Sequence, residues 1–251
     1  IITSVLAPAN KWLKPNTEAI GELKCSYHGW RFDSLGRLLK APHASGSKLL
    51  NAQEIALKSI ALHIWGELVF VNFSANPEPF EGNSHEETYG SFRWEKLQHV
   101  KTARYSLKCN WKVFVDNYLD GGYHVSVLHP DLAQYLNLNS YKTEIYKHSS
   151  VQSCSLIGND SANRLGLNAF YGWFFPNTMI NRYGDWLDIN RVIPTSENSC
   201  DVIFEYFYED DYSKTNLDKD LVDSDHAQNQ DILISECVQQ SMESGAFNKG
   251  F

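Results

Sequence analysis

The segment Cys109–Pro130, CNWKVFVDNYLDGGYHVSVLHP, constrains this chain more than any other stretch. It places His124 and His129 with four residues between them, after two acidic residues and a double glycine. Residues i and i+5 of an ideal α-helix point about 140° apart, because each residue turns about 100°. The two imidazoles can therefore bind one metal ion only where the helix ends or is distorted between them. Gly121-Gly122 and Pro130 supply breaks of that kind.

The residue types in this segment favour a transition metal and leave one ligand to be found. Imidazole suits iron, copper, nickel and zinc, while two histidines and one carboxylate with open positions are typical of non-haem Fe(II) oxygen chemistry. Asp231 is the predicted carboxylate, because it precedes an apolar run in QNQDILISEC and is expected to face the core. Asp223 and Asp225 have a more polar setting and are expected to be solvated. The alternative is structural, since most isolated histidine pairs bind no metal and most helical aspartates lie at the surface.

Cys25-Ser-Tyr-His28 is a second metal signal, with C-x2-H spacing between strand-like runs. Alone, such a pair is half of a zinc site or no site at all. Beside an iron-type site it indicates a Rieske [2Fe–2S] cluster, in which two cysteines hold one iron and two histidines hold the other. The cluster is a suitable electron donor for oxygen activation at a single Fe(II). The five cysteines are scattered and odd in number, which predicts a reducing compartment rather than a disulfide framework.

Composition excludes several classes of protein. The 251 residues, 43% hydrophobic and 21% charged, are typical of a globular protein with one large or two small domains. A net charge of −8 without a basic run argues against a nucleic-acid binder. The sequence has no uninterrupted apolar run of about 18 residues, so no transmembrane helix is predicted. The first residue is Ile1, and we interpret the chain as a fragment trimmed at both ends.

The order of apolar runs and turn signals predicts an α+β fold. Short runs punctuated by glycine over residues 1–76 indicate a small all-β module, and the Pro-, Glu- and Gly-rich residues 77–90 indicate a linker. Residues 91–251 form the second predicted domain, an antiparallel sheet flanked by helices, similar to a helix-grip arrangement.

Individual elements of this fold follow from the same patterns. Strands are expected at residues 63–73, 99–109, 149–156, 167–175, 178–194 and 200–208. The turn signal NRYGDW within 178–194 predicts a hairpin. Helices are expected over WKVFVDNYL and over residues 216–245, where Gly245 is placed for a C-cap. The apolar stripe expected to face the core along the long helix consists of Leu217, Leu221, Ile234, Cys237 and Val238.

Two segments resemble motifs of the large (alpha) subunits of Rieske non-haem iron oxygenases. CSYHGWRFD is similar to the second half of their Rieske motif, and CNWKVFVDNYLDGGYHVSVLHP is similar to their mononuclear-iron motif. PNTMINRYGDWLDINRVIP and QDILISECVQQ are more similar to the plant-type choline monooxygenases than to the ring-hydroxylating dioxygenases. The resemblance covers the chain from about Gly21 to its end. It implies a Rieske [2Fe–2S] domain at 1–76, the linker at 77–90, and a mononuclear iron catalytic domain at 91–251 that is truncated at its C-terminal end.

The resemblance also assigns residues to the two metal centres. It implies that His124, His129 and Asp231 bind a mononuclear Fe(II) ion. It implies that Cys25 and His28 bind the [2Fe–2S] cluster, each at a different iron.

The chain departs from the family pattern at two places. The C-x-H half of the Rieske motif is expected near positions 5–8, where the sequence reads VLAP, and no cysteine or histidine precedes Cys25. A cluster is therefore not expected to assemble on the chain as written, through a faulty gene model or an inactive variant. The family's bridging acid stands three residues before the first histidine, where this chain has Gly121. Asp120 is the candidate electron-transfer bridge in its place, or alternatively a helix cap, and Asn117 is the other candidate catalytic residue.

The resemblance implies O2-dependent hydroxylation of choline at its alcohol carbon, which yields betaine aldehyde through its hydrate. Electrons would come from reduced ferredoxin or a reductase, and the subunits would form a homo-oligomer, often a trimer. A quaternary ammonium has no N–H to donate and is best held by aromatic faces. Trp186, Tyr183 and Phe175 are therefore the candidate substrate-binding residues, although most alternating aromatics in strands belong to a core.

Three alternatives stand beside this interpretation. A sister Rieske enzyme that demethylates glycine betaine or another methylated amine, or oxidises carnitine, would have identical metal ligands. A catalytically inactive variant or regulatory subunit would explain the missing half of the cluster motif. A plain zinc protein is the third. The expected location is an intracellular soluble compartment, the chloroplast stroma for a plant or algal protein and otherwise the cytoplasm.

Overall fold

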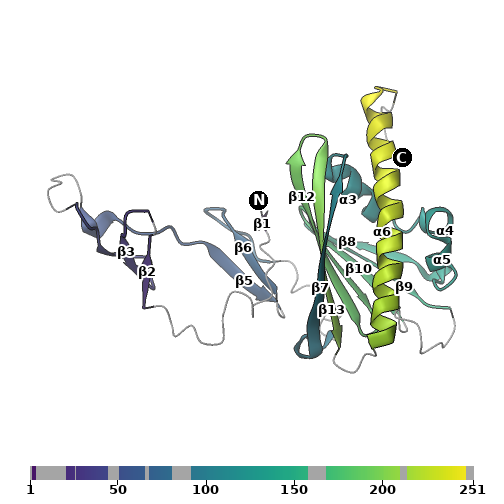
Figure 1. Cartoon of the computed structure of the whole chain (residues 1–251), viewed down its shortest axis with the longest axis horizontal. Helices are drawn as coiled ribbons and strands as arrows, with labels where there is room; N and C mark the ends of the chain where they lie inside the picture. Colours follow the sequence, from purple (N-terminus) through teal and green to yellow (C-terminus); the bar gives the residue numbers. More distant parts are fainter. Residues whose placement is uncertain are drawn as a thin grey trace. The chain divides into compact units, whose positions relative to one another are not determined.

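The computed structural model divides the chain into two compact units, Ile1–Phe80 and Glu81–Phe251 (Figure 1). The residues that the structure describes are 2–3, 21–25, 27–44, 51–65, 68–80, 92–157, 168–209 and 214–246. Positions 5–8 lie outside the described residues, as does most of the predicted linker, from residue 81 onward.

The first unit consists of short antiparallel strands, as the glycine-punctuated sequence predicts. One three-stranded sheet has the order β2-β3-β4 and another has the order β1-β6-β5. Their bounds are Ile2–Thr3 for β1, Glu22–Lys24 for β2, Arg31–Asp33 for β3, Leu38–Lys40 for β4, Ala61–Trp65 for β5 and Leu68–Asn72 for β6. A 3₁₀ helix, η1, spans Ala52–Glu54.

The prediction of a single strand at residues 63–73 is wrong, because the structure has two strands there. Trp65 of β5 pairs with Leu68 of β6, so the chain reverses between them. The glycine at position 66 fits the alternation of a continuous strand equally well, and the pattern alone could not separate the two cases.

The second unit contains a seven-stranded antiparallel sheet in the order β7-β13-β12-β11-β10-β9-β8 (Figure 1). Its strands span Leu97–Leu107 (β7), Lys142–Ile145 (β8), Ser149–Ser155 (β9), Asn168–Phe174 (β10), Thr178–Tyr183 (β11), Trp186–Ser196 (β12) and Ser199–Glu209 (β13). Short 3₁₀ helices span Trp94–Lys96 (η4) and Leu138–Ser140 (η5). This antiparallel sheet with helices confirms the α+β prediction.

Most strands of this sheet follow the predicted ranges. The hairpin predicted from NRYGDW joins β11 to β12, where Tyr183 pairs with Trp186 and Gly184 has a φ of +53°. The edge strand β8 was not predicted, because all four of its residues are exposed and no buried face imposes an alternation on its sequence.

Two helices pack beside the sheet and bring distant segments together. Helix α3, Trp111–Leu119, contacts α6, Lys214–Glu243, and also β12 and β13. The side chain of Asn110 caps α3 by accepting a hydrogen bond from the backbone N–H of Lys112 at 3.0 Å. Val113, Phe114 and Val115 anchor α3 in the core.

Helix α6 confirms the first half of the predicted apolar stripe and corrects the second half. Leu217 and Leu221 pack against the core, whereas Ile234, Cys237 and Val238 are exposed. The most buried side chains in the described part of the helix are polar, namely Asp220, Ser224, Gln228, Ser235 and Gln239. This polar burial follows from the surface beneath, because buried tyrosines of β13 present hydroxyls that need partners.

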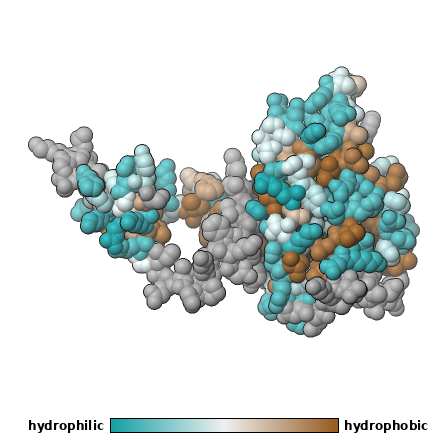
Figure 2. All heavy atoms as spheres, in the orientation of Figure 1, coloured by the Kyte–Doolittle hydropathy of each residue, from teal (hydrophilic) through white to brown (hydrophobic). Residues whose placement is uncertain are grey.

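Two hydrogen bonds show how the polar face is satisfied. The Tyr208 hydroxyl donates to Asp220 Oδ2 at 3.1 Å, and the Tyr206 hydroxyl lies 3.2 Å from Ser224 Oγ. The helix ends as predicted, with Gly245 at a φ of +72° just after its last residue. On the visible face of the second unit, hydrophobic patches lie among hydrophilic residues (Figure 2).

The helix is interrupted on both sides of His124, as the spacing of the two histidines predicts. Helix α3 ends at Leu119, and Gly121 and Gly122 have φ angles of +76° and +75°. A short helix, α4, spans Val125–Leu128, and another, α5, spans Pro130–Ala133. His129 lies between them with φ −120° and ψ 61°, outside the helical region.

We expect Gly122→Ala to destabilise the second unit more than Gly121→Ala. Both substitutions place a side chain at positive φ, which costs about 1–2 kcal/mol. A Cβ at position 122 would also lie 2.7 Å from the ring of Tyr141, whereas at position 121 its nearest contact is Thr143 Oγ1 at 3.8 Å. The Tyr141 hydroxyl donates to Gln152 Oε1 at 2.8 Å, which restrains the ring.

Thermal unfolding followed by circular dichroism measures this difference. Gly121→Ala should lower the Tm by roughly 2–6 °C, and Gly122→Ala by at least twice as much. Equal shifts for the two variants would contradict the close approach of Tyr141.

Candidate metal centre

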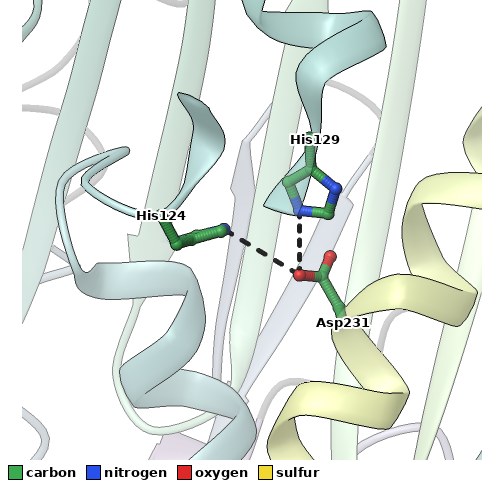
Figure 3. Close-up of side chains that lie close together, drawn as sticks. All are labelled: His124, His129 and Asp231. Atoms are coloured by element: carbon green, nitrogen blue, oxygen red, sulfur yellow. Dashed lines mark hydrogen bonds and ion pairs between the residues drawn. The ribbon is translucent and has the colours of Figure 1, made fainter. Parts of the chain in front are cut away.

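Three side chains from two distant segments converge on one point (Figure 3). His124 and His129 come from the break between α3 and α5, and Asp231 comes from the middle of α6. His129 Nε2 lies 3.1 Å from Asp231 Oδ1, and His124 Nε2 lies 3.9 Å from the same oxygen. In the part of the chain that the structure describes, this is the one group of three or more potential metal-ligating side chains whose ligand atoms lie within 4.8 Å of one another.

Hydrogen bonds on the outer nitrogens determine which way each imidazole faces. His124 Nδ1 lies 2.5 Å from Asp120 Oδ2, and His129 Nδ1 lies 2.7 Å from Gln230 Oε1. Both oxygens are acceptors, so each Nδ1 carries the hydrogen and donates it. The Nε2 atoms then present lone pairs toward the Asp231 carboxylate.

Two lone pairs facing a carboxylate require a cation between them. In the absence of a metal a proton meets part of this need. Burial alone would lower the pKa of His129, but its hydrogen bond to Asp231 and the charge of that carboxylate raise the pKa above its ordinary value. A metal ion with bonds of about 2.0–2.2 Å places neighbouring ligand atoms about 3.0–3.5 Å apart. The 3.1 Å separation from His129 to Asp231 falls in this range, and the 3.9 Å separation from His124 to Asp231 lies just above it. The donor set therefore fits one divalent transition-metal ion.

Two further residues orient these ligands. Asn117 donates its Nδ2–H to Asp231 Oδ1 at 2.9 Å, so it turns the carboxylate toward the histidines. Gln230 is a residue that the sequence analysis missed, and its position next to Asp231 was the available signal. Outer partners of this kind hold ligand orientation and tautomer.

Cys25 and His28 lie in the first unit on a turn held by backbone hydrogen bonds. The Cys25 N–H donates to the Trp30 carbonyl at 2.8 Å, and the Gly29 N–H donates to the Cys25 carbonyl at 3.0 Å. Backbone N–H groups of His28 and Tyr27 lower the pKa of the exposed Cys25 thiol. A Rieske cluster needs two cysteines and two histidines, and the motif present supplies one of each. These residues therefore do not by themselves fit a [2Fe–2S] cluster.

A cavity of about 140 Å³ lies beside the three converging side chains and has all of them in its wall. Tyr183, predicted to bind substrate, lines it. Trp186 and Phe175 are not among the lining residues. Trp186 is fully buried and donates to Asp188 Oδ2 at 2.8 Å, while Phe175 is 44% exposed.

The sheet contributes polar side chains to this cavity that the sequence analysis did not single out. Asn181, Asp188 and Asn190 line it from β11 and β12, and all are buried. The sequence contained a signal for them, because strand alternation places them on the same face as Tyr183 and Trp186. Polar residues at core-facing positions of a strand depart from the usual pattern of apolar residues facing the core. Such departures are typical of functional sites.

Comparison with known proteins identifies the family to which the chain belongs. Residues 94–251 match the family model described as "Ring hydroxylating alpha subunit (catalytic domain)". The chain belongs to this family. The match includes all three converging residues and the whole of the seven-stranded sheet.

Individual relatives and a solved structure are consistent with this family. The chain is 36% identical over 245 residues to choline monooxygenase, chloroplastic, from Arabidopsis thaliana, covering 90% of this chain and 58% of that protein. It is 23% identical to a carnitine monooxygenase oxygenase subunit from Acinetobacter pittii, with 88% and 59% covered. A crystal structure of the quaternary ammonium Rieske monooxygenase CntA with an inhibitor has a TM-score of 0.72 at 19% identity, covering 88% of this chain and 62% of that one.

These relatives are longer than the chain, which spans less than two thirds of each. The likeness to CntA therefore concerns the fold. Among the described helices, none is long and apolar enough to cross a membrane.

We expect the chain to bind one Fe(II) ion per molecule under anaerobic conditions, as measured by isothermal titration calorimetry. His129→Ala and Asp231→Ala should each abolish this binding, because each removes a ligand atom. Gln230→Leu should weaken it roughly 10–100-fold, since His129 loses the acceptor that orients it.

Asp223→Asn is the matched control, because Asp223 is an exposed carboxylate on the same helix. It should leave the affinity unchanged. Wild-type affinity in Asp231→Ala would exclude this metal centre.

Proposed function

We propose that this chain carries the oxygen-reacting site of a monooxygenase that oxidises choline to betaine aldehyde for glycine betaine synthesis. The observation that carries the proposal is the convergence of His124, His129 and Asp231 beside a cavity. Two histidines and one carboxylate are the ligand set of non-haem Fe(II) oxygenases. The 36% identity to a choline monooxygenase supports the substrate.

The proposed reaction inserts one oxygen atom into a C–H bond of the alcohol carbon. Choline, O2, two electrons and two protons give the hydrate of betaine aldehyde and one water, and the hydrate then loses water. Iron bound by the triad would supply the activation of O2. The chain's own residues hold and orient the triad, since Asp120 and Gln230 turn the imidazoles and Asn117 turns the carboxylate.

The cavity wall supports a quaternary ammonium substrate. Tyr171 and Tyr183 face the cavity with ring centroids 5.4 Å apart at an interplanar angle of 66°. Four further aromatic residues line the wall: Phe114, Tyr118, Tyr141 and Phe204. A trimethylammonium group is attracted to aromatic faces and needs no hydrogen-bond acceptor.

Two buried amides support an alcohol as the other end of the substrate. Asn190 Oδ1 and Gln228 Nε2 are buried atoms that have no hydrogen-bond partner among the described residues, and both side chains line the cavity. A hydroxyl can donate to the amide oxygen and accept from the amide N–H at once. A carboxylate, as in glycine betaine or carnitine, can only accept.

The proposal also includes a source of electrons, a cellular compartment and a homo-oligomeric assembly. Reduced ferredoxin or a reductase is the proposed source of electrons, in an intracellular soluble setting that is the chloroplast stroma for a plant or algal protein. Asp120 is the proposed bridge to a neighbouring subunit of a homo-oligomer, a trimer, because its carboxylate is bonded to His124 and is 30% exposed. The incomplete motif at Cys25 and His28 favours a second candidate, an inactive variant.

Hydrogen peroxide tests the oxygen site without an electron donor. It carries the oxygen atom and both electrons in one molecule, so choline and peroxide give the aldehyde hydrate and water. The Fe(II)-loaded chain should form betaine aldehyde, detected by mass spectrometry, and should convert glycine betaine and carnitine at least ~10-fold more slowly.

The His129→Ala variant controls for iron free in solution. Turnover of carnitine or glycine betaine without turnover of choline would identify a sister enzyme. No turnover of any of the three by a metal-loaded chain would identify the inactive variant.

Asn190→Leu tests the proposed hydroxyl contact with a side chain of similar size. Loss of one buried hydrogen bond should raise the KM for choline roughly 10-fold. Fe(II) affinity should stay unchanged, because Asn190 does not contact the triad ligands in the hydrogen bonds described. An unaltered KM would remove Asn190 from the substrate site.

A further inference from the structure

A cationic substrate in the cavity would lie close to a bound metal cation, so its charge must be offset by other groups. A divalent metal ion bound by two neutral imidazoles and Asp231 exceeds the charge of that one carboxylate by one unit. Asp120 is a further carboxylate, but it lies on the outer side of His124 and is 30% exposed, so water partly screens its charge. A quaternary ammonium in the cavity would therefore find no full opposite charge at the metal centre. Burying a charge is costly unless an opposite charge lies near, so a carboxylate in the cavity wall is needed.

Asp188 is the carboxylate in the cavity wall that the triad does not use. It lies on β12, faces the cavity and is 3% exposed. We propose that Asp188 is the counter-charge that binds the ammonium group of the substrate. The inference rests on the proposed function, in that it takes the substrate to be a methylated ammonium compound.

The surroundings of Asp188 hold its carboxylate in place. Asn181 Nδ2 donates to Asp188 Oδ1 at 2.7 Å, and Trp186 Nε1 donates to Oδ2 at 2.8 Å. Both donors are uncharged, so these two bonds orient the carboxylate and do not themselves offset its negative charge. Asn181 is itself held by the Tyr118 hydroxyl, which donates to Asn181 Oδ1 at 2.7 Å.

The aromatic residues lie where such a counter-charge would act. In the sheet register Asp188 pairs with Asn181 on β11, and Asn181 pairs with Tyr171 on β10. Tyr171 and Tyr183 line the same cavity as Asp188. Aromatic faces accept the methyl groups of a quaternary ammonium, while the carboxylate offsets its charge at longer range because a methylated nitrogen cannot donate a hydrogen bond.

A network that only stabilises the fold would behave differently from a counter-charge. Loss of a structural network would weaken every ligand of this shape equally. Loss of a counter-charge would weaken only the cation. Choline and its uncharged carbon isostere, 3,3-dimethylbutan-1-ol, have the same shape and hydroxyl, so they separate these two roles.

The experiment measures binding by isothermal titration calorimetry to the Fe(II)-loaded chain under anaerobic conditions. The probes are choline, tetramethylammonium and 3,3-dimethylbutan-1-ol. The wild-type chain should bind choline at least ~10-fold more tightly than the alcohol. Asp188→Asn should raise the Kd of choline and tetramethylammonium roughly 10–100-fold and change that of the alcohol less than about 3-fold.

Asp185→Asn is the matched control, because it removes one carboxylate from the same hairpin at a half-exposed position. It should leave all three Kd values unchanged. Circular dichroism checks that Asp188→Asn is folded. If it is not, Asp188→Ser takes its place as a second variant that removes the same charge, with the same expected outcome for all three probes.

Three outcomes overturn the inference: equal wild-type affinity for choline and the alcohol, equal weakening of all probes by Asp188→Asn, or no binding of either cation. Failure of the proposed function looks different. A chain that binds tetramethylammonium through Asp188 but forms no betaine aldehyde with peroxide keeps the counter-charge and loses the choline reaction.

Discussion

Two imidazole lone pairs pointed at one carboxylate oxygen are the interaction on which the catalytic unit depends. Atoms of this kind repel one another unless a cation lies between them, so the surrounding structure must hold them together. Asp120, at the end of α3, holds His124, while Gln230 on α6 holds His129. Because the two acceptors come from different helices, the packing of α3 against α6 determines whether the site exists.

The polar buried face of α6 follows from this demand. A helix with Asp231 and cavity-lining residues on its inner side has little room there for a continuous apolar stripe, and Leu217, Leu221 and Ile232 are its apolar residues that pack against the core. Hydrogen bonds with Tyr206 and Tyr208 in the sheet also hold the helix, as does Gln239, whose Oε1 accepts from the Asn110 backbone N–H at 2.8 Å. Buried hydrogen bonds are directional, so they fix the rotation of the helix more tightly than an apolar stripe would.

The cavity combines features that suit a cationic alcohol. Its wall has aromatic rings, a buried carboxylate at Asp188, and amide atoms of Asn190 and Gln228 that have no hydrogen-bond partner among the described residues. The proposed counter-charge at Asp188 would lie in the sheet wall, and the proposed hydroxyl contacts would lie at Asn190 and Gln228. A molecule with a positive end and a hydroxyl end is thereby given one orientation, which brings the same carbon to the metal centre each time.

The sequence by itself determined the two histidines, the helix break between them and the α+β class, because these depend on local spacing and on glycine and proline. It also indicated Asp231, whose apolar neighbours suggested an inward position. Only the tertiary structure decided which face of α6 is turned toward the sheet. Its most buried side chains are polar, and a polar face has no hydrophobic periodicity from which it could be predicted. The same holds for Gln230, Asp188 and Asn190, because a polar side chain acquires a partner or a cavity only when segments far apart in the chain are packed together.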